Sequence, residues 1–149
     1  VRDGLKKIDT EYILFTLEDY YFQTKIDSYI EESLKILKLK NFDKVALICN
    51  SHFWGYRLAY TDINNFYQML PNCNNLATLQ LGIWKKECFE KVLDPKYSPW
   101  DFEIKGRDTL VNDKCGVLDP NKELTFNFAR KGKVFSDGWQ EFNIQKIIL

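Results

Sequence analysis

Two adjacent carboxylates, Glu18 and Asp19, directly follow the apolar run of residues 12–17. In open α/β sheets, ligands bind outside the carboxyl ends of the strands, where backbone groups and loops converge. Paired carboxylates at such a position can coordinate Mg²⁺ or Mn²⁺, which prefer oxygen ligands and can bridge to a substrate diphosphate. A strand end that simply meets solvent is the alternative, but the aromatic run at residues 20–22 favours a ligand site.

A basic turn near the end of the sequence is a second candidate, in which three cations surround Gly132: Arg130, Lys131 and Lys133. A flexible basic turn can neutralise the charge of a diphosphate leaving group, although a solvated turn is the alternative. His52 has no visible nucleophile or acid partner in the sequence. Neither glycine-rich phosphate-binding motif is present, so a P-loop or dinucleotide-binding protein has no support.

The balance of charge argues against partners that need a strong overall field. Lysine plus arginine equals aspartate plus glutamate at 21 each, so nothing directs the chain toward nucleic acid or an anionic membrane. No apolar run approaches the roughly 20 residues of a membrane-spanning helix, and the sequence does not begin like a signal peptide. We therefore expect a cytoplasmic protein without a transmembrane segment.

The four cysteines are widely spaced and form no C-x-x-C pair: Cys49, Cys73, Cys88 and Cys115. No histidine lies close enough in the sequence to complete a zinc site. We expect these cysteines to be reduced thiols.

The elements that must position the candidate residues alternate between strand and helix patterns. The continuous apolar run at residues 12–17 predicts a strand inside a sheet, covered on both faces. Apolar residues three or four positions apart predict a helix over residues 26–39, with Asn41 as a stop. Residues 44–49 predict a second buried strand, so a βαβ-like unit is expected, with a right-handed crossover if its strands are parallel.

Shorter elements are predicted for the rest of the chain. Residues 50–75 are dense in Asn, Tyr, Phe and Trp and predict irregular structure with one short strand and a binding role. A strand over 76–84, helices over 85–93 and 99–108, a strand over 124–128 and a helix over 140–149 follow. The expected fold class is α/β, a mixed sheet flanked by helices, forming one domain or part of one over residues 1–149.

Three blocks of the sequence resemble glycosyltransferases of the GT-A, or nucleotide-diphospho-sugar transferase, fold. YILFTLEDYYF at residues 12–22 looks like the D-x-D-type segment of that fold. LATLQLGIWKK at 76–86 and SPWDFE at 98–103 are similar to segments of bacterial glycosyltransferase-like proteins associated with surface polysaccharide synthesis. The order and spacing of the three blocks are more specific than any one of them.

The resemblance implies donor-side roles. Asp19 and Glu18 would hold Mn²⁺ or Mg²⁺ and the donor diphosphate, although Glu18 departs from the more common aspartate of the motif. Gln80 and Trp84 would help to shape the pocket for donor and acceptor. Trp84 and Trp100 could each stack on a sugar, and a place in the core or in helix packing is the alternative for both, because tryptophan serves that role more often.

The resemblance also implies a catalytic base near the start of the helix predicted at residue 99. In inverting members an acid at such a position takes the proton from the acceptor hydroxyl, which is a poor nucleophile without a base. Asp101 and Glu103 are the candidates. Asp101 occupies the third helical position after Ser98 and Pro99, where an acid caps a helix without any chemistry, so Glu103 is the better candidate. A solvated helix face is the alternative for Glu103.

The resemblance therefore implies transfer of a sugar from a nucleotide-sugar donor to a saccharide acceptor in polysaccharide biosynthesis. Only 17 residues precede Glu18, so we expect the nucleotide-binding half of the GT-A fold to lie upstream, or to be replaced by a partner or a reduced fold. A non-catalytic carbohydrate- or protein-binding module, which uses the aromatic loop from Phe53 to Tyr67, is one alternative. A metal-dependent hydrolase that uses the same carboxylates is another, and the sequence leaves the oligomeric state open.

Overall fold

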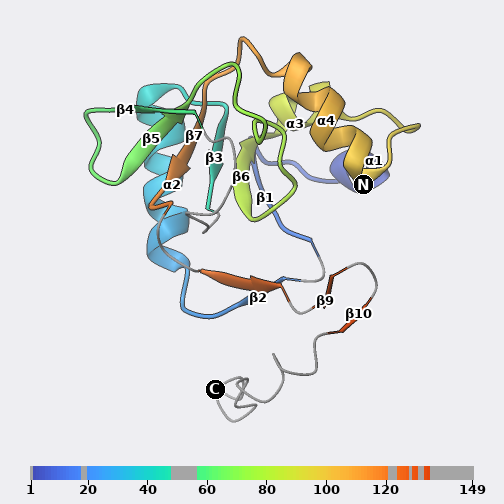
Figure 1. The fold of residues 1–149 in the computed structure, drawn as a ribbon, viewed down its shortest axis with the longest axis horizontal. Helices are drawn as coiled ribbons and strands as arrows, with labels where there is room; N and C mark the ends of the chain where they lie inside the picture. Colours follow the sequence, from blue (N-terminus) through green and yellow to red (C-terminus); the bar gives the residue numbers. More distant parts are fainter. Residues whose placement is uncertain are drawn as a thin grey trace.

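A computed structural model of the chain describes residues 2–17, 20–47, 57–120, 124–127, 129–130 and 133–134. Its centre is a mixed six-stranded sheet in the order β1-β6-β3-β7-β5-β4 (Figure 1). The strands, in sheet order, are β1 (Tyr12–Phe15), β6 (Gly82–Lys85), β3 (Lys44–Ala46), β7 (Cys115–Leu118), β5 (Phe66–Met69) and β4 (Leu58–Tyr60). The expected α/β class with a mixed sheet is therefore confirmed.

The strand directions place the carboxyl ends of several strands at the same end of the sheet. β3 pairs with β7 in parallel, whereas β6 runs antiparallel to both of its neighbours, β1 and β3. β1, β3 and β7 therefore run in the same direction. The helix α2 (Asp27–Lys40) lies between β1 and β3 in the chain. The expected βαβ-like unit is thus present with parallel strands, but β6 is inserted between them.

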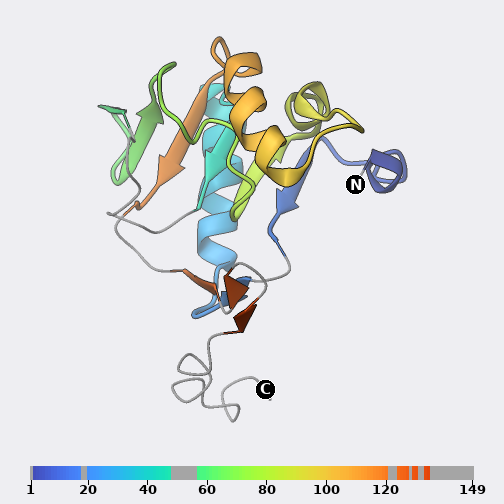
Figure 2. The same ribbon diagram turned by 45° about the vertical axis from the view of Figure 1, so that its right-hand side comes forward.

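Helices cover both faces of the sheet (Figure 2). α2 packs on one face, and α3 (Lys86–Val92) with α4 (Pro99–Thr109) packs on the other. Successive strand residues point to opposite faces, so Val45 packs with the α2 layer while Ala46 packs with the α3–α4 layer. The short helix α1 (Arg2–Leu5) contributes Leu5 to the α3–α4 layer.

Local signals in the sequence explain where the helices end. α2 stops at Asn41, whose φ of 53° lies in the left-handed region that asparagine tolerates. Lys38 and Lys40 in its last turn complement the negative end of the helix dipole. The helices predicted over 26–39, 85–93 and 99–108 are confirmed as α2, α3 and α4.

Two strand predictions were wrong. β1 was expected inside the sheet, but it lies at an edge and, within the described residues, pairs with β6 alone. Leu14 is accordingly 46% exposed, because an apolar run does not distinguish a central strand from an edge strand. The strand predicted over 76–84 begins only at Gly82, and residues 76–81 form turns and bends whose buried side chains mimic a strand pattern.

The region predicted as irregular contains more structure than expected. Its described part, residues 57–75, holds the antiparallel pair β4 and β5 rather than one short strand. The predicted strand at 124–128 is confirmed as β8 (Thr125–Asn127), which pairs with β2 (Tyr20–Phe22) in a separate two-stranded sheet. The helix predicted over 140–149 lies outside the described residues.

Two expectations concern thiols and membrane spans. Cys73, Cys88 and Cys115 are buried and free, which confirms the prediction of reduced thiols for the cysteines described. Cys49 lies outside the described residues. In the described parts of the chain, no helix combines the length and apolar character needed to cross a bilayer.

Candidate functional site

The first turn of α4 is held by a capping box. The hydroxyl oxygen of Ser98 accepts a hydrogen bond from the backbone N–H of Asp101 at 3.1 Å, and the Asp101 carboxylate accepts one from the Ser98 N–H at 3.2 Å. Lys105 lies 2.9 Å from the same carboxylate. The hydrogen bond from the Ser98 side chain, together with that from Lys105, lowers the pKa of Asp101 to about 2. Asp101 is thus engaged in capping, and so weak a base is poorly suited to proton abstraction.

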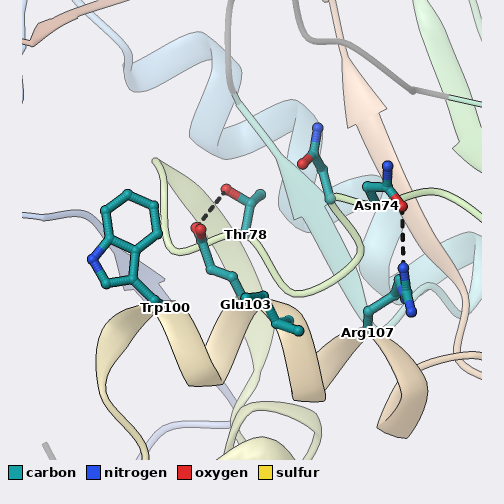
Figure 3. A pocket seen from close by; sticks show the side chains of 7 residues that line it. Asn74, Thr78, Trp100, Glu103 and Arg107 are labelled. Carbon is teal, nitrogen blue, oxygen red and sulfur yellow. Dashed lines mark hydrogen bonds between the residues drawn. The ribbon is translucent and has the colours of Figure 1, made fainter.

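Glu103 reaches from the next turn of α4 to residues 76–80, which we call the 76–80 loop. Its Oε1 accepts a hydrogen bond from the Leu79 backbone N–H at 2.8 Å. The same oxygen accepts a hydrogen bond from the Thr78 hydroxyl at 3.2 Å (Figure 3). The Thr78 hydroxyl oxygen also accepts from the Gln80 backbone N–H at 3.3 Å. Among the described residues nothing hydrogen-bonds Oε2 of Glu103, so one oxygen holds the loop and the other is free.

A cavity of about 280 Å³ lies beside Glu103, and we call it the α4 cavity. Trp100, Glu103 and Arg107 project from one face of α4 because they are three and four residues apart (Figure 3). Side chains from the segment before β6 face them across the cavity. The full lining is Asn74, Asn75, Thr78, Trp100, Glu103, Ile104 and Arg107.

The lining combines an aromatic surface with many hydrogen-bonding groups. Trp100 is 74% exposed, so most of its indole is available for contact. Arg107 donates to the Asn74 side-chain oxygen at 3.1 Å, which fixes that amide. The Asn75 side-chain nitrogen is buried and has no hydrogen-bond partner among the described residues. An apolar platform beside several polar groups can bind a flat ligand that carries hydroxyls.

The structure places Trp84 in the core. It is fully buried, and its ring meets those of Phe89 and Phe102 edge to face at 5.1 and 6.3 Å between centroids. This is the alternative that the sequence left open, and in this position Trp84 presents no surface to a ligand. Gln80 is half-buried beside Thr78, outside the lining of the α4 cavity.

The remaining predicted site residues are not brought to the α4 cavity by any described contact. Glu18 and Asp19 lie outside the described residues, as does His52. Arg130 and Lys133 occupy opposite positions in a small ribbon of β9 (Ala129–Arg130) and β10 (Lys133–Val134). The described ranges contain no group of three or more side chains able to hold a metal ion.

Several residues of the site were not identified from the sequence. Thr78, Asn74 and Asn75 belong to irregular structure, where no periodicity indicates which side chains converge. The spacing of Trp100, Glu103 and Arg107 on one predicted helix face was the available signal. It shows which residues share a face but not what lies opposite.

Comparison with known proteins adds no family assignment. No protein-family model matches the chain, and a search of curated proteins found no match. The class that the fold and the site define is therefore an α/β domain whose mixed sheet supports a polar, tryptophan-flanked cavity over α4.

Proposed function

We propose that this chain is the acceptor-side portion of a GT-A-type glycosyltransferase that moves a sugar from a nucleotide-sugar donor to a saccharide acceptor in polysaccharide biosynthesis. The observation that supports it most is the Glu103 carboxylate, which lines a cavity beside an exposed Trp100 and has one oxygen unengaged within the described structure. Glu103 is also one of the two acids, with Asp101, that the resemblance of residues 98–103 implies as the base.

The α4 cavity would bind the acceptor sugar. The Trp100 indole would pack against the apolar C–H face of the ring, and the amide and hydroxyl groups across the cavity would bond its hydroxyls.

Glu103 would act as the general base. Its Oε2 would take the proton from the acceptor hydroxyl, while the hydroxyl oxygen forms the new bond to the anomeric carbon and the nucleoside diphosphate leaves. The bonds from Leu79 and Thr78 to Oε1 would fix the orientation of the carboxylate during this step. Asp101 would serve the helix instead, since its carboxylate is engaged by Ser98 and Lys105.

The donor would be held at the end of the sheet where the carboxyl ends of β1, β3 and β7 lie. Glu18 and Asp19 follow β1 in the chain, and their carboxylate oxygens are the ligands that Mg²⁺ and Mn²⁺ prefer. When bound, such a cation would offset charge on the leaving diphosphate. Arg130 and Lys133 are proposed as further diphosphate contacts, on the strength of their charge.

The test is glycosyl transfer by the intact protein with Glu103→Gln, against Asp101→Asn as a matched control. We expect Glu103→Gln to lower turnover on the order of a hundredfold or more, because general-base catalysis contributes about 10²–10⁴-fold. Asp101→Asn should leave turnover within a fewfold of the unmodified protein. Equal turnover in the Glu103→Gln variant would remove Glu103 from the mechanism and with it the main support for this proposal.

A non-catalytic carbohydrate-binding module is the second candidate. It is favoured by the fact that Oε1 of Glu103 already holds the 76–80 loop, which is a structural role. Titration with UDP and Mn²⁺ separates the two, because the enzyme requires both to bind and the module is indifferent to them. Saccharide binding with no response to UDP or Mn²⁺ would favour the module.

A further inference from the structure

Lys44 is a lysine without exposed surface at the start of β3. Its ammonium group donates hydrogen bonds to the backbone carbonyls of Leu76 at 2.8 Å and Thr78 at 3.1 Å. The same nitrogen lies 4.1 Å from the centre of the Trp84 ring. No described acidic side chain forms an ion pair with it. Burial of a cation without an acidic partner is costly, so these contacts must offset a large loss of hydration.

Thr78 connects this buried cation to the α4 cavity. Its carbonyl oxygen accepts from Lys44, while its hydroxyl donates to Glu103 on the opposite side of the loop. The next residue, Leu79, donates its backbone N–H to the same carboxylate oxygen. The 76–80 loop is therefore held both by the buried cation of Lys44 and by the carboxylate of Glu103 at the cavity.

An ammonium group fits this position better than an apolar side chain of equal length. The loop is irregular and buried, so the carbonyls of Leu76 and Thr78 need a donor from outside regular structure. Lys44 donates one hydrogen bond to each carbonyl, and its ammonium group also makes a cation–π contact with the Trp84 ring. A methionine at the same place would leave both carbonyls unpaired.

We propose that Lys44 is a positioning residue of the α4 cavity, which fixes the 76–80 loop so that Thr78 and Leu79 align the Glu103 carboxylate for its ligand. The part that concerns the ligand rests on the proposed function, whereas the alignment of the loop does not. Lys44 touches no substrate in this scheme, and its effect passes through Thr78.

The pKa of Lys44 differs from those of two thiols near it. Four titratable side chains lie near Lys44: Cys73 from the segment before the 76–80 loop, Cys88 from α3, Cys115 from β7 and Glu103 from α4. Burial lowers the pKa of Lys44 to about 8, and burial raises the pKa of the Cys115 thiol to about 12. Burial likewise raises the pKa of Cys88. Lys44 therefore loses its charge in a pH range in which these two thiols stay protonated.

The first experiment follows the loop directly by NMR, through the Leu79 amide and the Thr78 methyl group. In Lys44→Met we expect both resonances to shift and the exchange of the Leu79 amide to accelerate about tenfold or more, because the hydrogen bond to Glu103 weakens. Lys85→Met is the matched control, since Lys85 is also nearly buried but bonds Asn41 and Asp43 instead of the loop. Unchanged Thr78 and Leu79 signals in Lys44→Met would overturn the proposal.

A second measurement does not depend on whether Lys44→Met folds. In the unmodified protein the Thr78 and Leu79 resonances should titrate with a midpoint near pH 8, the pKa of Lys44. A Cys73→Ala variant should keep this titration, which excludes the neighbouring thiol as its source. Resonances that stay constant from pH 6.5 to 9.5 would contradict a link between Lys44 and the loop.

Saccharide titration separates the two proposals. If Lys44→Met disturbs the loop and weakens saccharide binding about tenfold or more while Lys85→Met does neither, the positioning role is supported. If the loop responds as expected but no saccharide binds to any form, the proposed function fails and the positioning of Glu103 stands. If saccharide binds equally well to the unmodified protein and to Lys44→Met, the positioning role fails.

Discussion

At the scale of single residues, Glu103 has two oxygens with different surroundings. Oε1 accepts from Leu79 and Thr78, so Glu103→Ala should cost about 1–3 kcal/mol of unfolding free energy by leaving the buried Leu79 N–H unpaired. Glu103→Gln keeps an oxygen acceptor and should cost clearly less. Urea denaturation of the two variants measures the difference. Equal losses would mean that the hydrogen bonds to Oε1 do not stabilise the loop.

The two tryptophans near the site lie in opposite environments and predict opposite phenotypes. Trp84 is fully buried and Trp100 is 74% exposed. Trp84→Ala should destabilise the fold by about 3–5 kcal/mol, as expected for loss of a large core side chain. Trp100→Ala should leave stability within about 0.5 kcal/mol, yet weaken saccharide binding roughly tenfold through lost stacking. Thermal denaturation and saccharide titration of both variants check this, and intact binding by Trp100→Ala would exclude stacking.

Lys44 predicts a pH dependence of stability with a definite sign. Its pKa is lowered from 10.5 to about 8 in the folded protein, so between those values the unfolded chain binds the proton more tightly. This contribution to the free energy of unfolding therefore rises with pH, by about 2 kcal/mol between pH 7.5 and 10. Below pH 8 both states are protonated, and the contribution is constant and unfavourable.

The measurement for Lys44 is urea denaturation of the unmodified protein and of Lys44→Met at pH 7.5 and pH 10. The free energy of unfolding of the unmodified protein should rise relative to that of the variant as the pH increases. The comparison with the variant cancels the contributions of the other titratable groups, because both proteins contain them. A difference that is constant across these pH values would show that the buried amine keeps an ordinary pKa.

At the scale of elements, α4 packs closely at one glycine. A methyl group on Gly106 would overlap Val92 and approach the Ala77 Cβ at 2.8 Å, so α4 or the loop containing Ala77 would have to shift. Gly106→Ala should gain about 1 kcal/mol of helix propensity and lose more from overpacking, for a net destabilisation of about 1–2 kcal/mol. Gly4→Ala in α1 is the control, because nothing lies within 4 Å of its added methyl group. A stabilised Gly106→Ala variant would mean that α4 relaxes freely.

The elements that the sequence predicted well carry their signals locally. α2 has an amphipathic repeat and a stop at Asn41, and α4 has Ser98 and Pro99 at its start, so both were found within a residue or two. The edge position of β1 and the turns of residues 76–81 depend on contacts distant in the chain. Lys44 belongs to this second group, since its carbonyl partners are at least 32 residues away and a lysine before an apolar run is ordinarily a solvated strand start.

At the level of the whole molecule, the proposed donor site and the proposed acceptor site belong to two different regions. The carboxyl ends of β1, β3 and β7 lie at one end of the sheet, whereas the α4 cavity lies in the layer of α3 and α4. The sequence predicted the α/β class and a strand–helix–strand unit around α2, and it left open whether the two strands are parallel. It did not predict the insertion of β6, because strand order depends on pairing between segments about 40 residues apart.

Because the two proposed sites are separate, a substitution in one site should impair the binding of its own ligand and leave the binding of the other ligand intact. Asp19→Asn in the intact protein should abolish glycosyl transfer and the Mn²⁺-dependent binding of UDP, because it removes a carboxylate proposed to hold the cation. Saccharide binding at the α4 cavity should be unaffected, whereas Glu103→Gln should lower turnover and leave UDP binding intact. Asp9→Asn is the matched control, since Asp9 is an exposed acid on the other side of β1 in the chain. Calorimetric titration with UDP and Mn²⁺ measures the donor side, and retained transfer by Asp19→Asn would remove the metal role proposed for that residue.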